Sequence, residues 1–428
     1  MILKLAYLNL FRNRNRALST GLAICIGFVG MNLLGAYIFR IKKALDTTSV
    51  YSALLGHVRL YKQDSLVQFS LKPKKYIFQK EEMIQIENII NGFGSEVEYT
   101  AKNINGSGLL SNGKTSHPIL FSSFDPEVYA KSLSQPDVTK WAKDWILPSQ
   151  FKNIDVFRNN NEVMSITPKI ADIMSLTYPL GLNESLQLAG RTLDGDLNAV
   201  NLDLGAEHTT GLEFLEDTMV LIPFKKAQEL FSTEGAESIS IYLNPYTNLE
   251  NFIKKLDLQL GVLPFKVDRY SYYDEKINSV YLGTMGFLMV MGAFFIFLIG
   301  TAVSLSIINS LTMGIIERTR EIGTLYAVGF KKKDVSKLFI YENLLLCLCS
   351  IVVGVGIAFL ISSFVNSLDI RFTPPSVIGK IQFKLVWNFS IALSVAAFTI
   401  MLTFLSSYVV MKNKSKIKLI DLLNDCGA

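Results

Sequence analysis

The sequence predicts an α-helical membrane protein with four transmembrane helices and a large extracytoplasmic α+β domain inserted between helices 1 and 2. Half of the 428 residues are hydrophobic, 18% are charged and the mean hydropathy is +0.31, a composition that is unusual for a soluble protein. Four charge-free stretches also exceed the roughly 20 residues that a helix needs to cross the hydrocarbon core of a membrane.

The charge-free stretches cover residues 17–39, 277–316, 343–368 and 385–411. With their flanks they predict transmembrane helices at 17–45, 277–313, 335–368 and 385–411, and a short external loop at 369–384. The second stretch is about twice the length that a span requires, so we expect it to continue beyond the bilayer. The first stretch is too long for the apolar part of a signal peptide, typically about 7–15 residues.

The segment before the first span, residues 1–16 (MILKLAYLNLFRNRNR), is amphipathic. We expect it to form an interfacial helix under the membrane, with Arg12, Arg14 and Arg16 at the membrane interface. The alternative is an ordinary positively charged flank. Further Lys and Arg residues cluster between spans two and three and in the basic tail at 412–428. All three clusters lie on one side, which the positive-inside rule makes cytoplasmic together with both termini.

The external segment, residues 46–276, predicts a mixed α/β domain with its own core. Strand patterns occur at 54–62, 116–124, 219–222 and 238–243. Helical spacing of apolar residues occurs at 80–91, 224–231 and 249–256. Residues from about 103 to 215 are rich in turn residues and short strands, which predicts a β-rich insertion into an α/β subdomain.

The stretch GLLSNGKT, from Gly108 to Thr115, satisfies the G-x-x-x-x-G-K-[ST] pattern of phosphate-binding loops. Such a loop must follow a buried strand and open a helix. Here the preceding residues are polar, and Pro118 would lie inside the required helix. The predicted location is also outside the cytoplasm, where ATP is not maintained. Two glycines around a polar tip favour a β-hairpin instead, so we expect no cofactor to bind this chain.

No other candidate chemistry stands out in the sequence. His57, His117 and His208 lack ligand spacing, so we expect no metal site. Asp194 and Asp196 resemble a calcium loop that lacks its remaining ligands, and a solvated turn is the simpler interpretation. Cys25, Cys347 and Cys349 lie in predicted spans and Cys426 near the end, so no disulfide framework is indicated. No catalytic arrangement can be defended, and we predict a chain that is not an enzyme.

The most informative segment is the predicted cytoplasmic connection between spans two and three. Its first part, residues 314–334, carries four charges within five residues and apolar residues near helical spacing. One short helix presenting both faces would suit docking into a groove on a cytoplasmic partner. The alternative is a charged loop that only satisfies topology.

The pattern E-R-x-x-E-I-G-x-L-x-A-x-G-F in this connection resembles the signature of FtsX-like ABC transporter permeases. In that family the segment is the coupling helix that contacts the ATPase. The resemblance assigns this role to Glu317, Arg318, Arg320, Glu321, Ile322, Gly323, Leu325, Tyr326, Gly329 and Phe330. The order of one span, an external domain and three spans is also similar to the family. GHVRLY, GLLSNG, FDPEVY and IPFKKAQELF resemble the Lol-type, lipoprotein-releasing branch, which is related to MacB-type permeases.

The resemblance implies a permease subunit in the inner membrane of a bacterium, with the large domain in the periplasm. Its implied partners are a cytoplasmic ABC ATPase dimer that binds ATP and Mg, a second permease, a periplasmic carrier or adaptor, and lipoprotein or other amphiphilic cargo; no nucleic acid is implied. The implied function is extraction of lipoproteins driven by hydrolysis in the separate ATPase. Efflux of a peptide, toxin or lipid, and signalling to cell-wall hydrolases without transport, are the alternatives.

Overall fold

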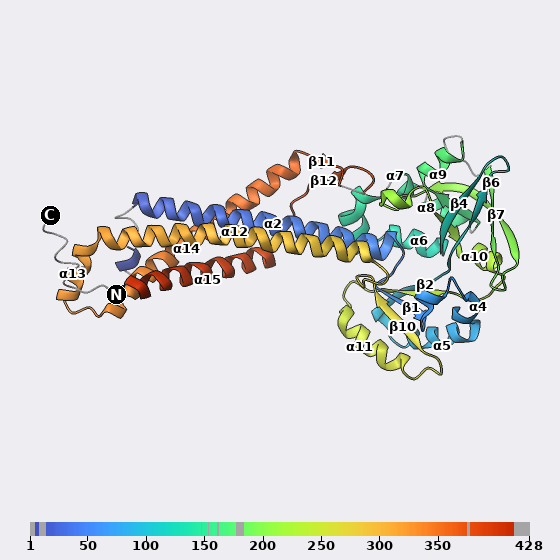
Figure 1. Cartoon of the computed structure of the whole chain (residues 1–428), viewed down its shortest axis with the longest axis horizontal. Coiled ribbons are helices and arrows are strands. Elements are labelled where there is room, and N and C mark those ends of the chain that lie inside the picture. Colours follow the sequence, from blue (N-terminus) through green and yellow to red (C-terminus); the bar gives the residue numbers. More distant parts are fainter. Residues whose placement is uncertain are drawn as a thin grey trace. The chain divides into compact units, whose positions relative to one another are not determined.

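The computed structural model describes residues 5–7, 14–146, 148–152, 154–160, 162–176, 184–374 and 377–414. The chain divides into two compact units. Unit 1 comprises residues 1–41, 286–370 and 383–428, and unit 2 comprises residues 42–285 and 371–382. Figure 1 labels the elements along the chain.

Long apolar helices supply the described part of unit 1. They are α2 (Arg14–Thr47), α12 (Ser279–Glu317), α14 (Lys332–Ser367) and α15 (Phe389–Lys414), with the short α13 (Thr319–Ala327) between α12 and α14; the ends of α2 and α12 extend into unit 2. Four of these helices are long and apolar enough to cross a membrane. Together with the mixed α/β composition of unit 2, they confirm the predicted fold class.

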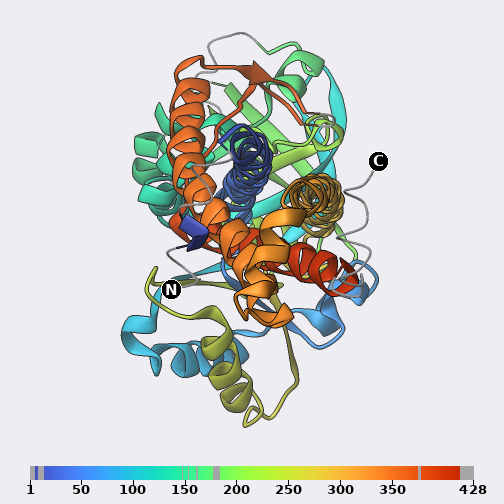
Figure 2. The same cartoon turned by 90° about the vertical axis from the view of Figure 1, so that its left-hand side faces the viewer.

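Helices α2 and α12 pack against each other in opposite chain directions, and Figure 2 looks nearly along both axes. Thr20 donates to the Ser310 hydroxyl at 2.5 Å near one end of the contact. Further along, a Cβ added at Gly27 would overlap the Val303 side chain, so this glycine permits the close approach. Helix α14 runs parallel to α2, and Gly354 lies against Phe28. The register of these helices is therefore fixed by small and polar side chains.

Unit 2 contains a four-stranded antiparallel sheet in the order β10-β1-β9-β2. The strands are β1 (Val58–Lys62), β2 (Val97–Asn103), β9 (Ser238–Leu243) and β10 (Val267–Ser271). Helices α5 (Lys80–Asn91) and α11 (Leu249–Leu260) contribute Ile86 and Leu256 to the core that the sheet shares with them. Amphipathic helices over one sheet face explain the helical spacing seen in the sequence.

The chain between β2 and β9 forms a closed barrel in the order β3-β4-β8-β5-β7-β6. Its strands are β3 (Asn105–Ser111), β4 (Ser116–Phe124), β5 (Val163–Ile166), β6 (Glu184–Arg191), β7 (Leu197–Glu207) and β8 (Met219–Pro223). Leu110, Phe121, Leu188 and Leu202 fill the barrel core, together with Leu230 of α10 (Phe224–Phe231). The β-rich insertion is predicted at about 103–215, and the barrel strands run from Asn105 to Pro223 of β8.

Short elements complete unit 2. They are α3 (Ser65–Gln68), α4 (Pro73–Tyr76), α6 (Pro126–Leu133), α7 (Pro148–Lys152), α8 (Ile154–Asn159), α9 (Pro168–Ile173), the π-helical turns Thr48–Ser52 and Val138–Ala142, the 3-10 turns Gly94–Glu96, Lys143–Trp145 and Glu213–Leu215, and the hairpin of β11 (Arg371–Phe372) with β12 (Ile381–Gln382). The hairpin belongs to the segment between α14 and α15. Ile378 donates its N–H to the Gly211 carbonyl beside the barrel.

Several predicted boundaries differ from the observed ones. The strand expected at 54–62 begins only at Val58, because Leu54 and Gly56 have positive φ values of 56° and 69° that an extended strand does not accommodate. Of the interfacial helix expected at 1–16, Arg14 and Arg16 belong to α2. Arg12 and most of that segment lie outside the described residues, as does the tail after residue 414.

Candidate functional site

The connection between α12 and α14 is a short helix framed by two breaks. Helix α12 ends at Glu317, and Arg318 interrupts the helical path with φ −101° and ψ 21° before α13 begins at Thr319. At the far end Gly329 has φ +100°, a conformation that favours glycine and ends helices. The N–H groups of Gly329 and Phe330 donate to carbonyls of the last turn of α13.

The structure therefore divides the predicted coupling segment at 314–334 among three elements. Residues 314–317 form the last turn of α12, residues 319–327 form α13, and residues 332–334 open α14. Of the four clustered charges, Glu317 and Arg318 precede α13, and only Arg320 and Glu321 lie on it. The periodicity of apolar residues runs through both breaks, which is why the sequence suggested one continuous short helix.

One face of α13 packs on the protein's own helices. Ile322 is buried against Leu311 and Ile315 of α12 and Val335 and Phe339 of α14. Leu325, Tyr326 and Phe330 pack at the edge of the same cluster, where burial raises the pKa of the Tyr326 phenol. Of the two faces that the sequence predicts, the apolar one is thus occupied by this chain's own helices.

The other face of α13 is open. Arg320, Thr324 and Ala327 are exposed, and Glu321 is partly exposed. A Cβ added at Gly323 would meet no atom within 4 Å. The open face of α13 therefore presents polar and small side chains.

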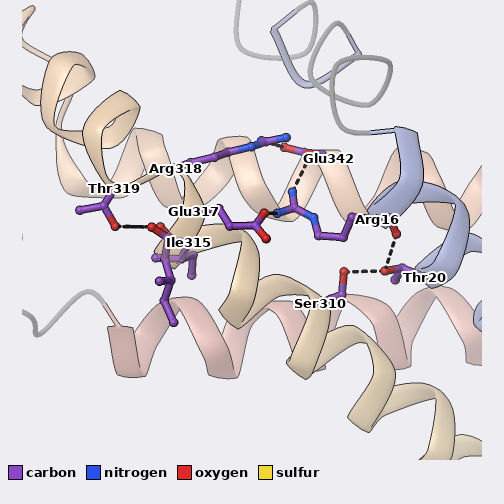
Figure 3. Close-up of polar contacts among 9 residues, drawn as sticks. Arg16, Thr20, Ser310, Ile315, Glu317, Arg318, Thr319 and Glu342 are labelled. Carbon is purple, nitrogen blue, oxygen red and sulfur yellow. Dashed lines mark hydrogen bonds and ion pairs between the residues drawn. The ribbon is translucent and has the colours of Figure 1, made fainter.

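An ion-pair cluster lies behind α13 and joins three helices (Figure 3). Arg318 donates from Nη1 to Oε2 of Glu342 in α14 at 2.9 Å. Arg16 of α2 places Nη2 3.7 Å from the other carboxylate oxygen of Glu342 and Nη1 3.4 Å from Glu317. Arg318 was predicted to face the ATPase, yet its side chain is only 7% exposed and turns inward. Glu342 was not among the predicted site residues.

The predicted membrane-interface residues separate in the structure. Arg14 is exposed, whereas Arg16 is partly buried by its contacts with the two carboxylates. A cavity of about 20 Å³ lies beside Arg16 and Glu342, lined also by Thr20, Ser310 and Asn343. This volume suffices for about one water molecule among polar groups.

The nucleotide-like pattern lies in a β-hairpin. Residues 108–111 belong to β3, and β4 starts directly after Thr115. The Asn112 side chain accepts the N–H groups of Lys114 and Thr115, and Gly113 has φ +81°, so the four residues form a tight turn. A strand follows this turn where a phosphate-binding loop requires a helix N-terminus.

The three histidines lie apart in unit 2. His57 accepts the N–H of Leu243 at 3.0 Å, and burial lowers its pKa to about 4. Burial also lowers the pKa of His208, to about 3, and its Nδ1 lies 3.1 Å from the Ser165 hydroxyl. His117 contacts the Asp217 carbonyl. Among the residues that the structure describes, no three His, Cys, Asp or Glu side chains are grouped to hold a metal ion.

One comparison with known protein families matches the helical part of the chain. Residues 293–419 match the FtsX-like permease C-terminal family. This match spans the second half of α12, α13, α14 and α15, so it includes the whole connection described above.

Curated relatives match a larger part of the chain. The macrolide export ATP-binding/permease protein MacB 2 of Yersinia pestis bv. Antiqua (strain Antiqua) is 27% identical over 193 residues, covering 43% of this chain and 28% of the relative. The ABC transporter permease YtrF of Bacillus subtilis (strain 168) is 25% identical over 207 residues, covering 46% of this chain and 44% of the relative. The matches thus span less than half the length of both relatives.

Two solved structures resemble unit 2 more remotely. The periplasmic region of MacB from Actinobacillus actinomycetemcomitans aligns with a TM-score of 0.36 and 10% identity, covering 53% of this chain and 91% of that one. The extracellular domain of the noncanonic ABC-type transporter YknZ aligns with a TM-score of 0.32 and 13% identity, covering 50% and 99%. At such scores these likenesses carry no conclusion about function.

Proposed function

We propose that this chain, which carries an FtsX-like permease domain and has MacB and YtrF-type homologues, is the membrane subunit of an ABC transporter whose ATP is hydrolysed by a separate ATPase. The observation that carries the proposal is α13. This helix is anchored by Ile322 to the helices around it, while Arg320, Gly323 and Thr324 remain on its open face. An anchored helix with a polar open face suits transient docking of a soluble partner.

The proposed mechanism is mechanical. ATP and Mg bind to the partner ATPase dimer, and its rearrangement pushes on α13. Because α13 shares a core with α12 and α14, movement of α13 displaces these helices as well. Helix α12 is continuous over 39 residues, so the displacement can pass along it without a hinge. Two copies of the permease, or two homologous chains, would pair to meet the two ATPase subunits.

We further propose lipoproteins as the cargo, extracted from the inner membrane and passed to a periplasmic carrier. The orientation that this requires has unit 2 in the periplasm and both termini in the cytoplasm, as the distribution of Lys and Arg favours. The support for lipoprotein release is the Lol-type resemblance of four short motifs in unit 2. Efflux of another amphiphile is the second candidate, favoured by the similarity to proteins named for macrolide export.

Purification of the full chain from native membranes through an affinity tag tests the proposal. We expect an ABC ATPase to co-purify in stoichiometric amount, and mass spectrometry of the bound material to show acylated proteins. Recovery of smaller amphiphiles in place of acylated proteins would select the efflux alternative. Recovery of the intact chain without an ATPase under conditions that preserve complexes would refute the permease assignment.

A further inference from the structure

The turn between α12 and α13 is held from behind by a buried carboxylate. Glu342 lies one helical turn beyond Leu338 in α14, and its residue exposure is 7%. Its Oε2 accepts Arg318, the residue at which the chain leaves α12 and enters α13. Because both side chains are almost fully removed from water, loss of either partner would remove the closest opposite charge from a buried group.

The same carboxylate also reaches the start of the chain. Its Oε1 lies 3.7 Å from Nη2 of Arg16, 326 residues away in sequence, and Arg16 in turn contacts Glu317 at the end of α12. Two carboxylates and two guanidinium groups therefore balance each other at one point, where α2, α12 and α14 meet α13 (Figure 3).

A glycine makes room for this arrangement. A Cβ added at Gly314 would overlap the guanidinium group of Arg16, which crosses α12 at this position. The Arg16 side chain can reach Glu342 along this path only while residue 314 has no side chain. The glycine at position 314 therefore makes room for a charged side chain and not for apolar packing.

We infer that Glu342 is a positioning residue, which fixes the α12–α13 turn to α14 and α2 and so sets the orientation in which α13 presents its open face. The inference rests on the proposed function, since it assigns the anchor of the proposed docking helix. It separates two roles within the clustered charges. Arg318 holds α13 inside the permease, whereas Arg320 is exposed on α13 to meet the ATPase.

Hydrogen exchange of the purified full-length chain, without the ATPase, tests the anchor directly. In Glu342→Gln we expect amide exchange across residues 319–327 to rise at least about tenfold, because Arg318 loses the carboxylate that ties the turn to α14. Exchange in α11 of unit 2 should keep its wild-type rate. A general loss of structure would instead raise exchange in α12 and α14 as well, and that outcome would overturn a specific positioning role.

A double variant without either charge tests whether the anchor depends on the ion pair or on the shape of the two side chains. In the double variant Arg318→Gln with Glu342→Gln no buried charge of this pair is left unpaired, and Arg16 retains Glu317. We expect exchange in 319–327 to lie between that of wild type and that of Glu342→Gln. If Glu342→Gln fails to insert, the double variant decides alone: exchange at the wild-type rate in 319–327 would overturn the proposal.

Gly323→Leu is the matched control on the open face. It should not raise exchange in 319–327, because its Cβ meets no atom of this chain within 4 Å, while it lowers the amount of ATPase that co-purifies. ATPase recovery unaffected by Gly323→Leu would count against the docking role of α13. The exchange result for Glu342→Gln would still decide whether Glu342 anchors the turn.

Discussion

The N–H of Asn105 donates to the buried carboxylate of Glu237 at 2.7 Å. This hydrogen bond joins the two connecting segments by which the chain leaves the sheet of unit 2 for the barrel and returns to it. Asn105 opens β3, the first barrel strand, and Glu237 directly precedes β9, the strand by which the chain returns to the sheet. Burial raises the pKa of Glu237 to about 7, although the Asn105 N–H and the charge of Arg59 oppose the shift.

This pKa predicts that unit 2 loses stability as the pH rises through neutrality. Because the folded-state pKa lies above the ordinary value of 4.5, the contribution of Glu237 is fully present below pH 4.5 and is lost as the pH rises through about 7. The full loss amounts to about 3 kcal/mol of unfolding free energy, of which about 2 kcal/mol falls between pH 5.5 and pH 8. Thermal unfolding of the full chain at pH about 5.5 and about 8 measures it.

Glu237→Gln is the control for this prediction. The variant keeps an acceptor for Asn105 but cannot ionise, so the difference between it and wild type should grow from pH 5.5 to pH 8. The buried His57 and His208 contribute equally to both proteins and cancel in the comparison. Parallel pH profiles would contradict the assignment to Glu237.

Gly323→Leu should release the ATPase. The substitution adds a bulky side chain to the open face of α13, where an added Cβ meets no atom of this chain within 4 Å, so we expect it to block contact with a second molecule. We expect ATPase binding to weaken at least about tenfold, a change of about 1.4 kcal/mol. Gly356→Leu is matched, because Gly356 is also a helical glycine with no neighbour within 4 Å. Equal pull-down of the ATPase by both variants would remove α13 as the docking site.

Charge reversal should act differently on α13 itself and in the ion-pair cluster of Arg318 and Glu342. Glu321→Lys lies on α13 and should cost about 2–5 kcal/mol of ATPase binding while the permease still inserts. Arg318→Glu places a second carboxylate beside Glu342 and should reduce insertion of the permease itself. Lys412→Glu in the last turns of α15 should leave ATPase binding unaltered. Membrane yield and pull-down of the ATPase separate the effects, and normal binding by Glu321→Lys would contradict the first expectation.

Lys114→Ala should leave nucleotide binding and ATP turnover of the complex at wild-type levels. Lys114 is exposed at the tip of a hairpin, without the helix N-terminus that a bound phosphate requires. The comparison is alanine substitution of the phosphate-loop lysine in the partner ATPase, which should abolish turnover. A comparable loss in Lys114→Ala would show that the hairpin binds nucleotide after all.

Thiol labelling tests the orientation in a chain whose four native cysteines are replaced. Cysteines at Lys114 and Leu258, both exposed in unit 2, should react with a membrane-impermeant reagent applied to the periplasmic side. A cysteine at Thr324, exposed on α13, should react only after the inner membrane is opened. Labelling of position 324 from outside would reverse the proposed topology.

Local pattern predicted the elements whose boundaries are set by local chemistry. The helix predicted at 80–91 has the observed bounds of α5, where Glu82 accepts the Gln79 N–H at the first turn. The strand at 238–243 and the helix at 224–231 also match, because apolar spacing changes at their ends. The strand that begins late, at Val58, depends on backbone angles that the residue types alone do not reveal.

The anchor behind α13 could not be found in this way. Glu342 immediately precedes the charge-free stretch at 343–368 and lies inside the span predicted at 335–368, and it was not considered as a partner. Its contacts reach Arg318, 24 residues away, and Arg16, 326 residues away, and no sequence periodicity links such positions. An ionisable residue within a predicted span was the one available signal.

The barrel leaves and rejoins the sheet at neighbouring points, since Asn103 of β2 is the ladder partner of Ser238 of β9. Residues 104–237 therefore form an insert whose two ends are already adjacent, and closing the gap without them would need only a short turn. Loop-closure entropy rises slowly with length, so the sheet tolerates inserts of very different size at this point. Because the barrel is closed, it also exposes no unpaired edge that depends on its host. The insert is nevertheless joined to its host by packing, since Phe69 and Ile77 belong to the barrel core, so a replacement for the barrel would have to cover these two side chains.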